Sequence, residues 1–297
     1  MKRILLIGAA LLAAMCSDDD GAERVTGPTE LNLISFNIRY PAEEDTGDLA
    51  WDVRKKAVIE MIRREKPDVI GFQEPRWNQV AYLMQQLDEY GHVKKNTNEG
   101  GDDASGAYNT IMYRRDKYTL LNSGAYWLST TPDRLSFPWA STDGQRRVTV
   151  WVHLKDNATR ADFFVFTTHL PYQTEAADNE ARLECVKLNV ERMKRYAGEE
   201  KPVFITGDMN ASYASNDARR GCLEPYYEWM SSAREKAAET DDKYSFNAFG
   251  GGDPKPAWNI DHIFYRNAEA LHFRTLDGDY GVTYISDHYP IACTLKF

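Results

Sequence analysis

The chain has 297 residues, a length that suits one large α/β domain or two small ones. A hydrophobic fraction of 42% and a charged fraction of 27% are ordinary for a globular protein and exclude global disorder. The net charge of −9 disfavours a long nucleic acid as partner without excluding it, because such binding depends on a basic surface that displaces counterions. An acidic protein can still act on phosphate esters if a divalent cation offsets the repulsion.

The N-terminal segment has the composition of a bacterial lipoprotein signal peptide. Lys2 and Arg3 precede an apolar run at 4–14, which is too short for a permanent membrane span, and Cys16 follows it. We therefore expect residues 1–16 to be a signal peptide that includes a lipidated Cys16, which would attach an exported protein to the outer membrane or cell surface. The alternative is a plain secretory signal, with the protein periplasmic or secreted.

The rest of the chain reads as a short tether followed by one domain. Residues 17–30 are acidic and poor in apolar side chains, a composition typical of a flexible linker. From residue 31 to residue 297 no interior linker or low-complexity run interrupts the chain. We expect a single domain over 31–297.

Apolar runs that end in polar side chains alternate with helical patterns along this domain. Helices are predicted at about 53–66, 77–87 and 178–197, and strands at 31–38, 68–72, 110–113, 118–121, 126–128, 148–154, 163–168, 203–207, 258–265 and 289–295. A strand–helix–strand unit occurs twice, and both of its strands end in polar residues. Two such halves predict an α/β fold (mixed α+β) with four layers, α-β-β-α, in which two mixed β-sheets pack face to face with helices outside.

The polar residues at the strand ends form the candidate site. They are Asn37, Glu74, His169, Asp208, Asn210, Asp261, Asp287 and His288. Polar residues at one edge of a layered α/β fold tend to converge on one crevice. The set is rich in oxygen and lacks cysteine, which favours Mg²⁺ over structural zinc, and two imidazoles can move protons or stabilise charge at phosphorus. Asp261 can fix the tautomer of a histidine.

Several of these residues also have a purely structural interpretation. Glu74 precedes Pro75 and can cap the helix that follows. His169 can be a buried edge histidine, and Asp287 with His288 can form a turn before the last strand. Asp261 is harder to explain in this way, because an acid inside a buried strand needs a partner.

Six motifs follow one another along the chain: SFNIR, GFQE, TTHL, TGDMN, NIDHIF and SDHYPI. They resemble the motifs of the endonuclease/exonuclease/phosphatase (deoxyribonuclease I-like) superfamily, and in particular those of a secreted bacterial branch. The resemblance covers about 31–297. It implies in-line attack of water on phosphorus, with Mg²⁺, or alternatively Mn²⁺, as cofactor. It implies metal ligation by Glu74 with Asn37 and Asp287.

The same resemblance implies roles for the other site residues. Asp208 and Asn210 would orient the water and the phosphate, and His288 would be the general base held by Asp261. His169 would contact the scissile phosphate. Arg39 and Arg147 are weaker candidates for phosphate binding, since either can be a solvated surface charge. His262 is expected to pack structurally, because its neighbour Asp261 points inward.

These features predict a metal-dependent phosphohydrolase that cleaves a phosphodiester or phosphomonoester. The alternatives are an extracellular nuclease, a sphingomyelinase-like phosphodiesterase, and a non-catalytic surface lipoprotein that binds a ligand on the same fold. The expected partners are a phosphate-ester substrate and, through Cys16, a membrane; no protein partner is evident from the sequence.

Overall fold

The computed structural model describes residues 27–98, 105–251 and 256–297, so the predicted signal peptide and most of the predicted tether lie outside the described residues. The described residues form two six-stranded sheets. The first contains, in spatial order, β11 (Glu269–Thr275), β12 (Ile291–Lys296), β1 (Glu30–Asn37), β2 (Val69–Gln73), β4 (Tyr108–Arg114) and β3 (Tyr90–Asn96). The second contains β5 (Tyr118–Trp127), β6 (Val148–Asp156), β7 (Asp162–His169), β8 (Val203–Asp208), β10 (Asp261–Arg266) and β9 (Ser231–Ser232).

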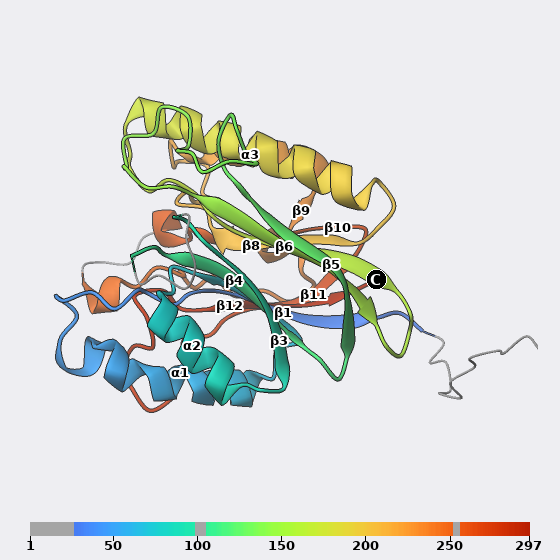
Figure 1. Ribbon diagram of the computed structural model, residues 1–297, viewed down its shortest axis with the longest axis horizontal. Coiled ribbons are helices and arrows are strands. Elements are labelled where there is room, and N and C mark those ends of the chain that lie inside the picture. The colour runs from blue at the N-terminus through green and yellow to red at the C-terminus, as the bar shows by residue number, and fades with distance from the viewer. Residues whose placement is uncertain (1–26, 99–104, 252–255) are drawn as a thin grey trace, which may run out of the picture.

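Helices cover the outer face of each sheet, which confirms the predicted four-layer sandwich (Figure 1). The helices are α1 (Trp51–Glu65), α2 (Trp77–Gln86), α3 (Ala176–Ala197), α4 (Glu224–Trp229) and α5 (Ala233–Lys236). One apolar cluster joins α1 and α2 to the first sheet, a second joins α3 and α4 to the second sheet, and a third lies between the sheets. Because every inner layer is buried on both sides, strands such as β2 and β8 are apolar almost throughout.

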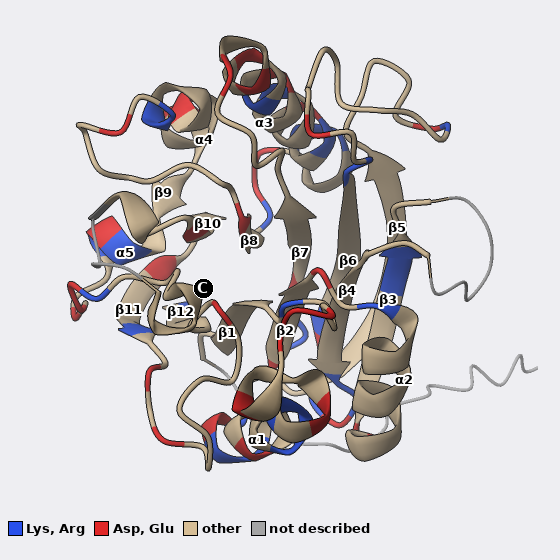
Figure 2. Ribbon diagram, turned by 90° about the vertical axis from the view of Figure 1, so that its left-hand side faces the viewer, with Lys and Arg blue, Asp and Glu red and all other residues tan. Residues whose placement is uncertain are grey.

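The predicted repeat of a strand–helix–strand unit is present in the structure. β1 and β2 pair in parallel across α1, and β7 and β8 pair in parallel across α3; the other pairings between neighbouring strands of the described residues are antiparallel. Parallel neighbours place their carboxyl ends at the same edge, so Asn37 lies beside Gln73, and His169 lies beside Asp208. Figure 2 shows the ends of these four strands grouped near the centre of the view.

Glycine allows the two sheets to approach closely near this edge. A Cβ atom on Gly71 of β2 would lie 2.2 Å from Thr206 Oγ1 of β8, a distance that no side chain could accept without displacement. Beside it, Gln73 Nε2 donates to Thr167 Oγ1 of β7 over 2.8 Å. The sheets are therefore tied together directly beneath the strand ends that carry the candidate site residues.

The sequence patterns missed both edge strands of the first sheet. β3 has half-exposed lysines and a glycine, and β11 alternates buried and exposed positions, so neither forms the apolar run by which the central strands are recognised. The separate strands predicted at 118–121 and 126–128 are one strand, β5, with an irregularity in its pairing after Leu120. The strand predicted from residue 258 begins at Asp261, since a 3₁₀ turn at Pro256–Trp258 comes before it.

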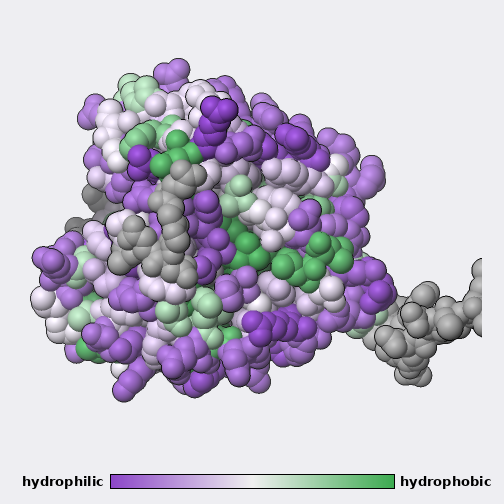
Figure 3. All heavy atoms as spheres, viewed as in Figure 1, coloured by the Kyte–Doolittle hydropathy of each residue, from purple (hydrophilic) through white to green (hydrophobic). Residues whose placement is uncertain are grey.

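The described residues present one mainly hydrophilic face in the view of Figure 3. On the face shown in Figure 3 the hydrophobic residues form small patches among hydrophilic ones. Within the described ranges, none of the helices combines the length and the apolar composition that crossing a bilayer requires.

Candidate active site

The candidate site residues surround one cavity of about 540 Å³ at the shared edge of the two sheets. Eight of the ten residues predicted for the site line this cavity: Arg39, Glu74, Arg147, His169, Asp208, Asn210, Asp287 and His288. Asn37 and Asp261 lie behind the lining, where each hydrogen-bonds a residue of the cavity wall. The structure thus brings together all ten residues from both halves of the chain.

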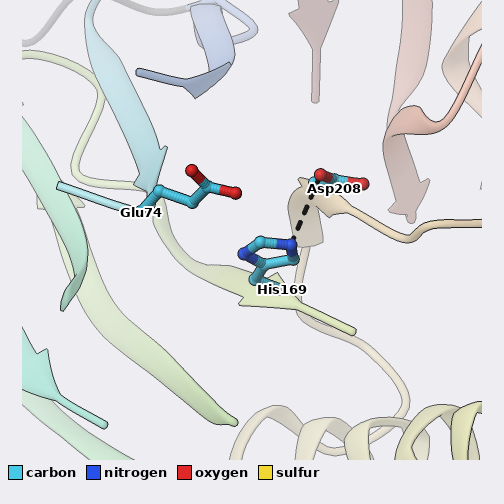
Figure 4. A group of neighbouring side chains, drawn as sticks. All are labelled: Glu74, His169 and Asp208. Carbon is cyan, nitrogen blue, oxygen red and sulfur yellow. Dashed lines mark ion pairs between the residues drawn. The ribbon is translucent and has the colours of Figure 1, made fainter. Parts of the chain in front are cut away.

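Glu74, His169 and Asp208 come from different strand ends and point toward one another (Figure 4). One ligand atom from each lies within 4.8 Å of the others, and His169 Nε2 is 3.4 Å from Asp208 Oδ2. Glu74 follows β2 in the left-handed region, with φ 71°, which turns its side chain out of the strand direction and into the cavity. The carboxylates of this group, with that of Asp287 in the same cavity wall, form an oxygen-rich set that fits a divalent cation.

Burial, together with the nearby carboxylates of Asp261 and Glu74, raises the pKa of Asp208 to about 7 against the opposing effect of His288. Burial also raises the pKa of Asp287, and Glu74 adds to this effect. Clustered acids of this kind are stabilised in their ionised form by a positive charge among them. The electrostatics of the site therefore agree with the donor geometry in favouring a cation.

Asn37 orients the acids through its amide nitrogen. Its Nδ2 donates to Glu74 Oε1 over 3.1 Å and to Asp208 Oδ2 over 3.0 Å. Its Oδ1 accepts the backbone N–H of Arg39. In this arrangement the amide oxygen of Asn37 faces the backbone of Arg39. Asn37 therefore positions the two carboxylates through its nitrogen, and its oxygen is turned away from them.

His288 and Asp261 form a buried pair next to Asp208. His288 Nδ1 lies 2.8 Å from Asp261 Oδ2, and His288 Nε2 lies 3.8 Å from Asp208 Oδ2. Burial alone would lower the pKa of His288, but the charges of Asp261, Asp208 and Asp287 and the hydrogen bond to Asp261 raise it to about 10. The pair therefore stabilises the imidazolium. A cation among these acids would lower the pKa of His288 and leave its imidazole free to take a proton from water, while Asp261 still stabilises the imidazolium that results.

His169 has the opposite electrostatic character. Burial, together with the positive charges of Arg147 and His288, lowers its pKa well below the usual value, so that the imidazole is neutral. Asn210 holds it in place: Asn210 Nδ2 is 3.1 Å from His169 Nε2 and donates to the carbonyl of Leu170 over 3.0 Å. The Asn210 backbone N–H donates to Asp208 Oδ1, and its φ of 49° directs the side chain back over β7.

The two predicted arginines are both in the cavity wall and both have acidic partners outside it. Arg39 Nε donates to Asp45 over 2.9 Å, and its Nη1 lies 3.8 Å from Asp287 Oδ2. Arg147 Nη2 donates to Asp143 over 2.9 Å. These partners hold the guanidinium groups in place while leaving further N–H donors for an anion.

Two completely buried arginines anchor the loops of the site, one in each half of the repeat. Arg54 of α1 donates to the carbonyls of Ile38, Arg39 and Ile285, which flank Asn37 and Asp287 in the chain. Arg182 of α3 donates to the carbonyls of Pro171 and Gln173, in the loop after His169. A guanidinium can satisfy several carbonyls at once, so irregular loops can stay fixed beside the cavity.

Several residues of the cavity wall were not predicted from the sequence, namely Tyr40, Arg76, Tyr172, Arg219, Phe246 and Trp258. Tyr40, Arg76 and Tyr172 lie within three residues of predicted site residues, so closeness in sequence was an available signal. Arg219 lies in a polar interval without any pattern, and only the folded chain brings it to the cavity.

Comparison with known proteins agrees with this geometry. Residues 34–288 match the model of the Endonuclease/Exonuclease/phosphatase family. An endonuclease/exonuclease/phosphatase from Bacteroides vulgatus has 28% sequence identity and a TM-score of 0.80, over 90% of this chain and 98% of that one. A mannosyl-6-phosphatase from Bacteroides thetaiotaomicron VPI-5482 has 26% identity and a TM-score of 0.80, over 90% of this chain and all (100%) of that one.

Curated relatives match over part of their length. Two uncharacterized proteins of Acanthamoeba polyphaga mimivirus are 27% identical over 119 residues and 24% identical over 165 residues. These matches cover 35% and 54% of this chain but only 17% and 59% of the relatives. The family model and the full-length structural similarity together place the site on a known framework, and the chain belongs to the endonuclease/exonuclease/phosphatase family, whose members are hydrolases of phosphoesters.

Proposed function

We propose that the protein is a divalent-cation-dependent phosphoester hydrolase that acts on a small phosphorylated substrate in the cavity described above. The observation that carries this proposal is the convergence of Glu74, His169 and Asp208 with the His288–Asp261 pair around one cavity. Mg²⁺ is the cation that the oxygen-rich donor set favours, with Mn²⁺ as the alternative. When bound, the cation supplies charge neutralisation at the phosphoryl oxygens.

The residues of the chain then have distinct tasks. Glu74 and Asp287 would hold the cation, and Asn37 orients Glu74 and Asp208. His288 takes a proton from the attacking water, whose oxygen forms a bond to phosphorus as the bond from phosphorus to the leaving oxygen breaks. Asp261 stabilises the resulting imidazolium. The leaving oxygen lies opposite the attacking water and takes its proton from solvent.

The phosphate itself is held by the other side of the cavity. Neutral His169 and the guanidinium groups of Arg39 and Arg147 contact its oxygens, where negative charge grows in the transition state. Asp208 and Asn210 keep the water and His169 aligned. Positioning and charge neutralisation supply most of the rate enhancement, as is general for phosphoryl transfer.

The substrate class follows from the cavity and the net charge. A small enclosed substrate fits a cavity of about 540 Å³, and a net charge of −9 gives little support to a long nucleic acid. The similarity to a mannosyl-6-phosphatase over nearly the whole chain supports a phosphomonoester such as a sugar phosphate.

The test is a side-by-side panel at fixed Mg²⁺: mannose 6-phosphate, bis(p-nitrophenyl) phosphate, sphingomyelin, inositol phosphates, DNA and RNA. We expect hydrolysis of a small ester, loss of activity with EDTA, and recovery with Mg²⁺ or Mn²⁺. Preferred cleavage of DNA, RNA or sphingomyelin would instead identify a nuclease or a sphingomyelinase-like enzyme. Binding of phosphorylated ligands with no hydrolysis of any of them would identify a non-catalytic binding protein.

The proposal includes export and attachment to a membrane through Cys16. Its support is the order of a basic pair, a short apolar run and Cys16 at the start of the chain, before an acidic tether at 17–30 and a domain at 31–297. Radiolabelled palmitate should be incorporated by the wild type in cells and not by Cys16→Ser. Equal labelling of both proteins, or no labelling of the wild type, contradicts lipidation.

A further inference from the structure

The cavity has two distinct ends along the shared edge of the sheets. The strands β12, β1, β2 and β4 of the first sheet follow one another in the same direction as β10, β8, β7 and β6 of the second, from left to right in Figure 2. The His288–Asp261 pair stands at the β12–β10 end. At the β4–β6 end, Asn109 Nδ2 donates to the carbonyl of Val148 over 2.6 Å and ties the two sheets together.

The leaving group belongs at the β4–β6 end. In-line attack by a water beside His288 makes the bond to the leaving oxygen break on the opposite side of phosphorus. The cavity wall near β4 and β6 contains one small, one cationic and one uncharged polar side chain, namely Ala107, Arg76 and Gln145. Arg76 is tied to the segment before β4, because its Nη1 donates to the carbonyl of Ser105 over 2.9 Å.

The four arginines of the cavity wall differ in how their charge is compensated. Three of them pair with carboxylates at 2.8–2.9 Å, namely Arg39, Arg147 and Arg219. Arg76 pairs with no carboxylate of the described residues; its guanidinium contacts the Ser105 carbonyl and lies over the ring of Tyr40. A guanidinium has five N–H donors, so Arg76 brings an uncompensated positive charge and unused donors to the cavity.

The ring of Tyr40 sets the spacing between Arg76 and the proposed phosphate site. Arg39, which belongs to that site, has its guanidinium carbon 4.5 Å from the centroid of the ring. The guanidinium carbon of Arg76 lies 5.2 Å from the same centroid. The two groups are therefore separated by no more than these two distances together. Two phosphates of one small molecule can span such a gap.

We propose that Arg76 binds a second phosphate, carried by the leaving group, so that the preferred substrates are small bisphosphates. A guanidinium with free N–H groups matches phosphate oxygens in a bidentate geometry. In a protein with a net charge of −9, a second phosphate needs a local positive charge of this kind. This inference rests on the proposed hydrolase function: water releases one phosphate as inorganic phosphate, and the alcohol that leaves keeps the other.

The experiment compares two substrates that differ by one phosphate, glucose 1,6-bisphosphate and glucose 6-phosphate. Whichever phosphate of the bisphosphate is attacked, the leaving group carries the other. We expect the wild type to have a kcat/KM about tenfold or more higher for the bisphosphate, and Arg76→Gln to lose most of this preference, mainly through KM, because charge-assisted bonds to phosphate are lost. The glutamine can still donate to the Ser105 carbonyl, and Arg76→Lys, which keeps the charge, should restore part of the preference.

The matched control is Arg115→Gln. Arg115 also donates through Nη1 to a backbone carbonyl, that of Asp88 over 3.0 Å, and it too has no carboxylate partner in the described part of the chain. It is exposed and lies outside the cavity, so this variant should keep the preference for the bisphosphate. An equal change of preference in both variants would mean that the general charge of the protein, and not a contact with Arg76, favours the bisphosphate.

Three further results overturn the inference. An equal loss on both substrates in Arg76→Gln means that Arg76 supports the segment at Ser105 and does not touch a second phosphate. A wild type that prefers 6-phosphogluconate to glucose 1,6-bisphosphate means that this end of the cavity binds a carboxylate. If no ester is hydrolysed, the proposed function fails, but calorimetry still tests the subsite: glucose 1,6-bisphosphate should bind Arg76→Gln about tenfold more weakly than the wild type. Equal binding by the two proteins would refute it.

Discussion

His288 Nδ1 and Asp261 Oδ2 are 2.8 Å apart, although 26 residues separate them in the chain, and both side chains are almost entirely buried. Asp261 begins β10, directly beside Asp208 in the antiparallel register with β8. His288 stands just before β12, at the same edge of the other sheet. The pair thus bridges the two sheets at the cavity and links proton transfer to the packing of one sheet on the other.

Asp261→Asn should lower kcat by about 10²-fold or more while it leaves KM and Mg²⁺ affinity nearly unchanged, because the amide preserves the shape but cannot stabilise an imidazolium. Without the Asp261 carboxylate, the main influences that raise the pKa of His288 are lost, so this pKa should fall from about 10. Rapid-mixing kinetics and NMR titration of His288 measure the two effects. A variant with full kcat would show that Asp261 does not act through His288.

Glu74→Gln should weaken Mg²⁺ and Mn²⁺ binding about tenfold or more, because it removes a charge from the cation site while Asn37 Nδ2 can still donate to the remaining oxygen. Isothermal titration of the metal-free protein gives the affinity directly. Glu44→Gln is the matched control: Glu44 accepts from Arg39 near the site, but its side chain is 67% exposed and lies outside the cavity. Similar losses in both variants would show a general charge effect in place of ligation by Glu74.

Arg54→Lys should loosen the loops that carry Asn37 and Asp287, since an ammonium cannot reach the carbonyls of Ile38, Arg39 and Ile285 together. We expect a lower melting temperature and, in addition, weaker metal binding, with unsatisfied carbonyls costing about 1–3 kcal/mol each.

The control for Arg54→Lys is Arg192→Lys. Arg192 is also buried, but it bonds Tyr196 and Asp133 away from the cavity. This variant should lose stability without losing metal affinity. If the two variants change metal binding equally, Arg54 has a structural role alone.

Acid should destabilise the protein through His262. This histidine is buried, and its Nε2 lies 2.7 Å from the carbonyl oxygen of Ala211. Burial lowers the pKa of His262 from 6.5 to about 4. A histidine whose pKa is lowered by folding contributes stability that is fully present above its pKa in the unfolded chain. This stability is lost as the pH falls toward its pKa in the folded protein, because in that range only the unfolded chain takes up the proton. Between pH 7 and pH 5 this removes about 2 kcal/mol from the free energy of unfolding.

His262→Gln keeps a donor for the Ala211 carbonyl and does not titrate. Urea denaturation at pH 7 and pH 5 should therefore show a smaller loss of stability in His262→Gln than in the wild type, by about 2 kcal/mol. Parallel losses in the two proteins would mean that His262 does not carry this acid sensitivity.

The sequence by itself determined the central strands, the main helices and the ends at which Glu74, His169 and Asp208 stand. Those strands are buried on both faces, so their apolar runs and the polar residues that end them are visible without any tertiary information. The repeat of a strand–helix–strand unit was visible for the same reason. Even so, the edge strands β3 and β11 escaped notice, because their half-exposed positions carry polar residues.

The tertiary structure decided what lies around those strand ends. Asn37 turns its amide nitrogen toward the carboxylates, and Arg219, Phe246 and Trp258 reach the cavity from loops that have no periodic pattern. The positions of these groups depend on contacts between residues far apart in the chain, such as the bonds from Arg54 to Ile38 and Ile285. Local sequence encodes burial through periodicity, whereas the direction of a side chain in a loop is fixed only when the folded chain supplies its distant hydrogen-bond partners.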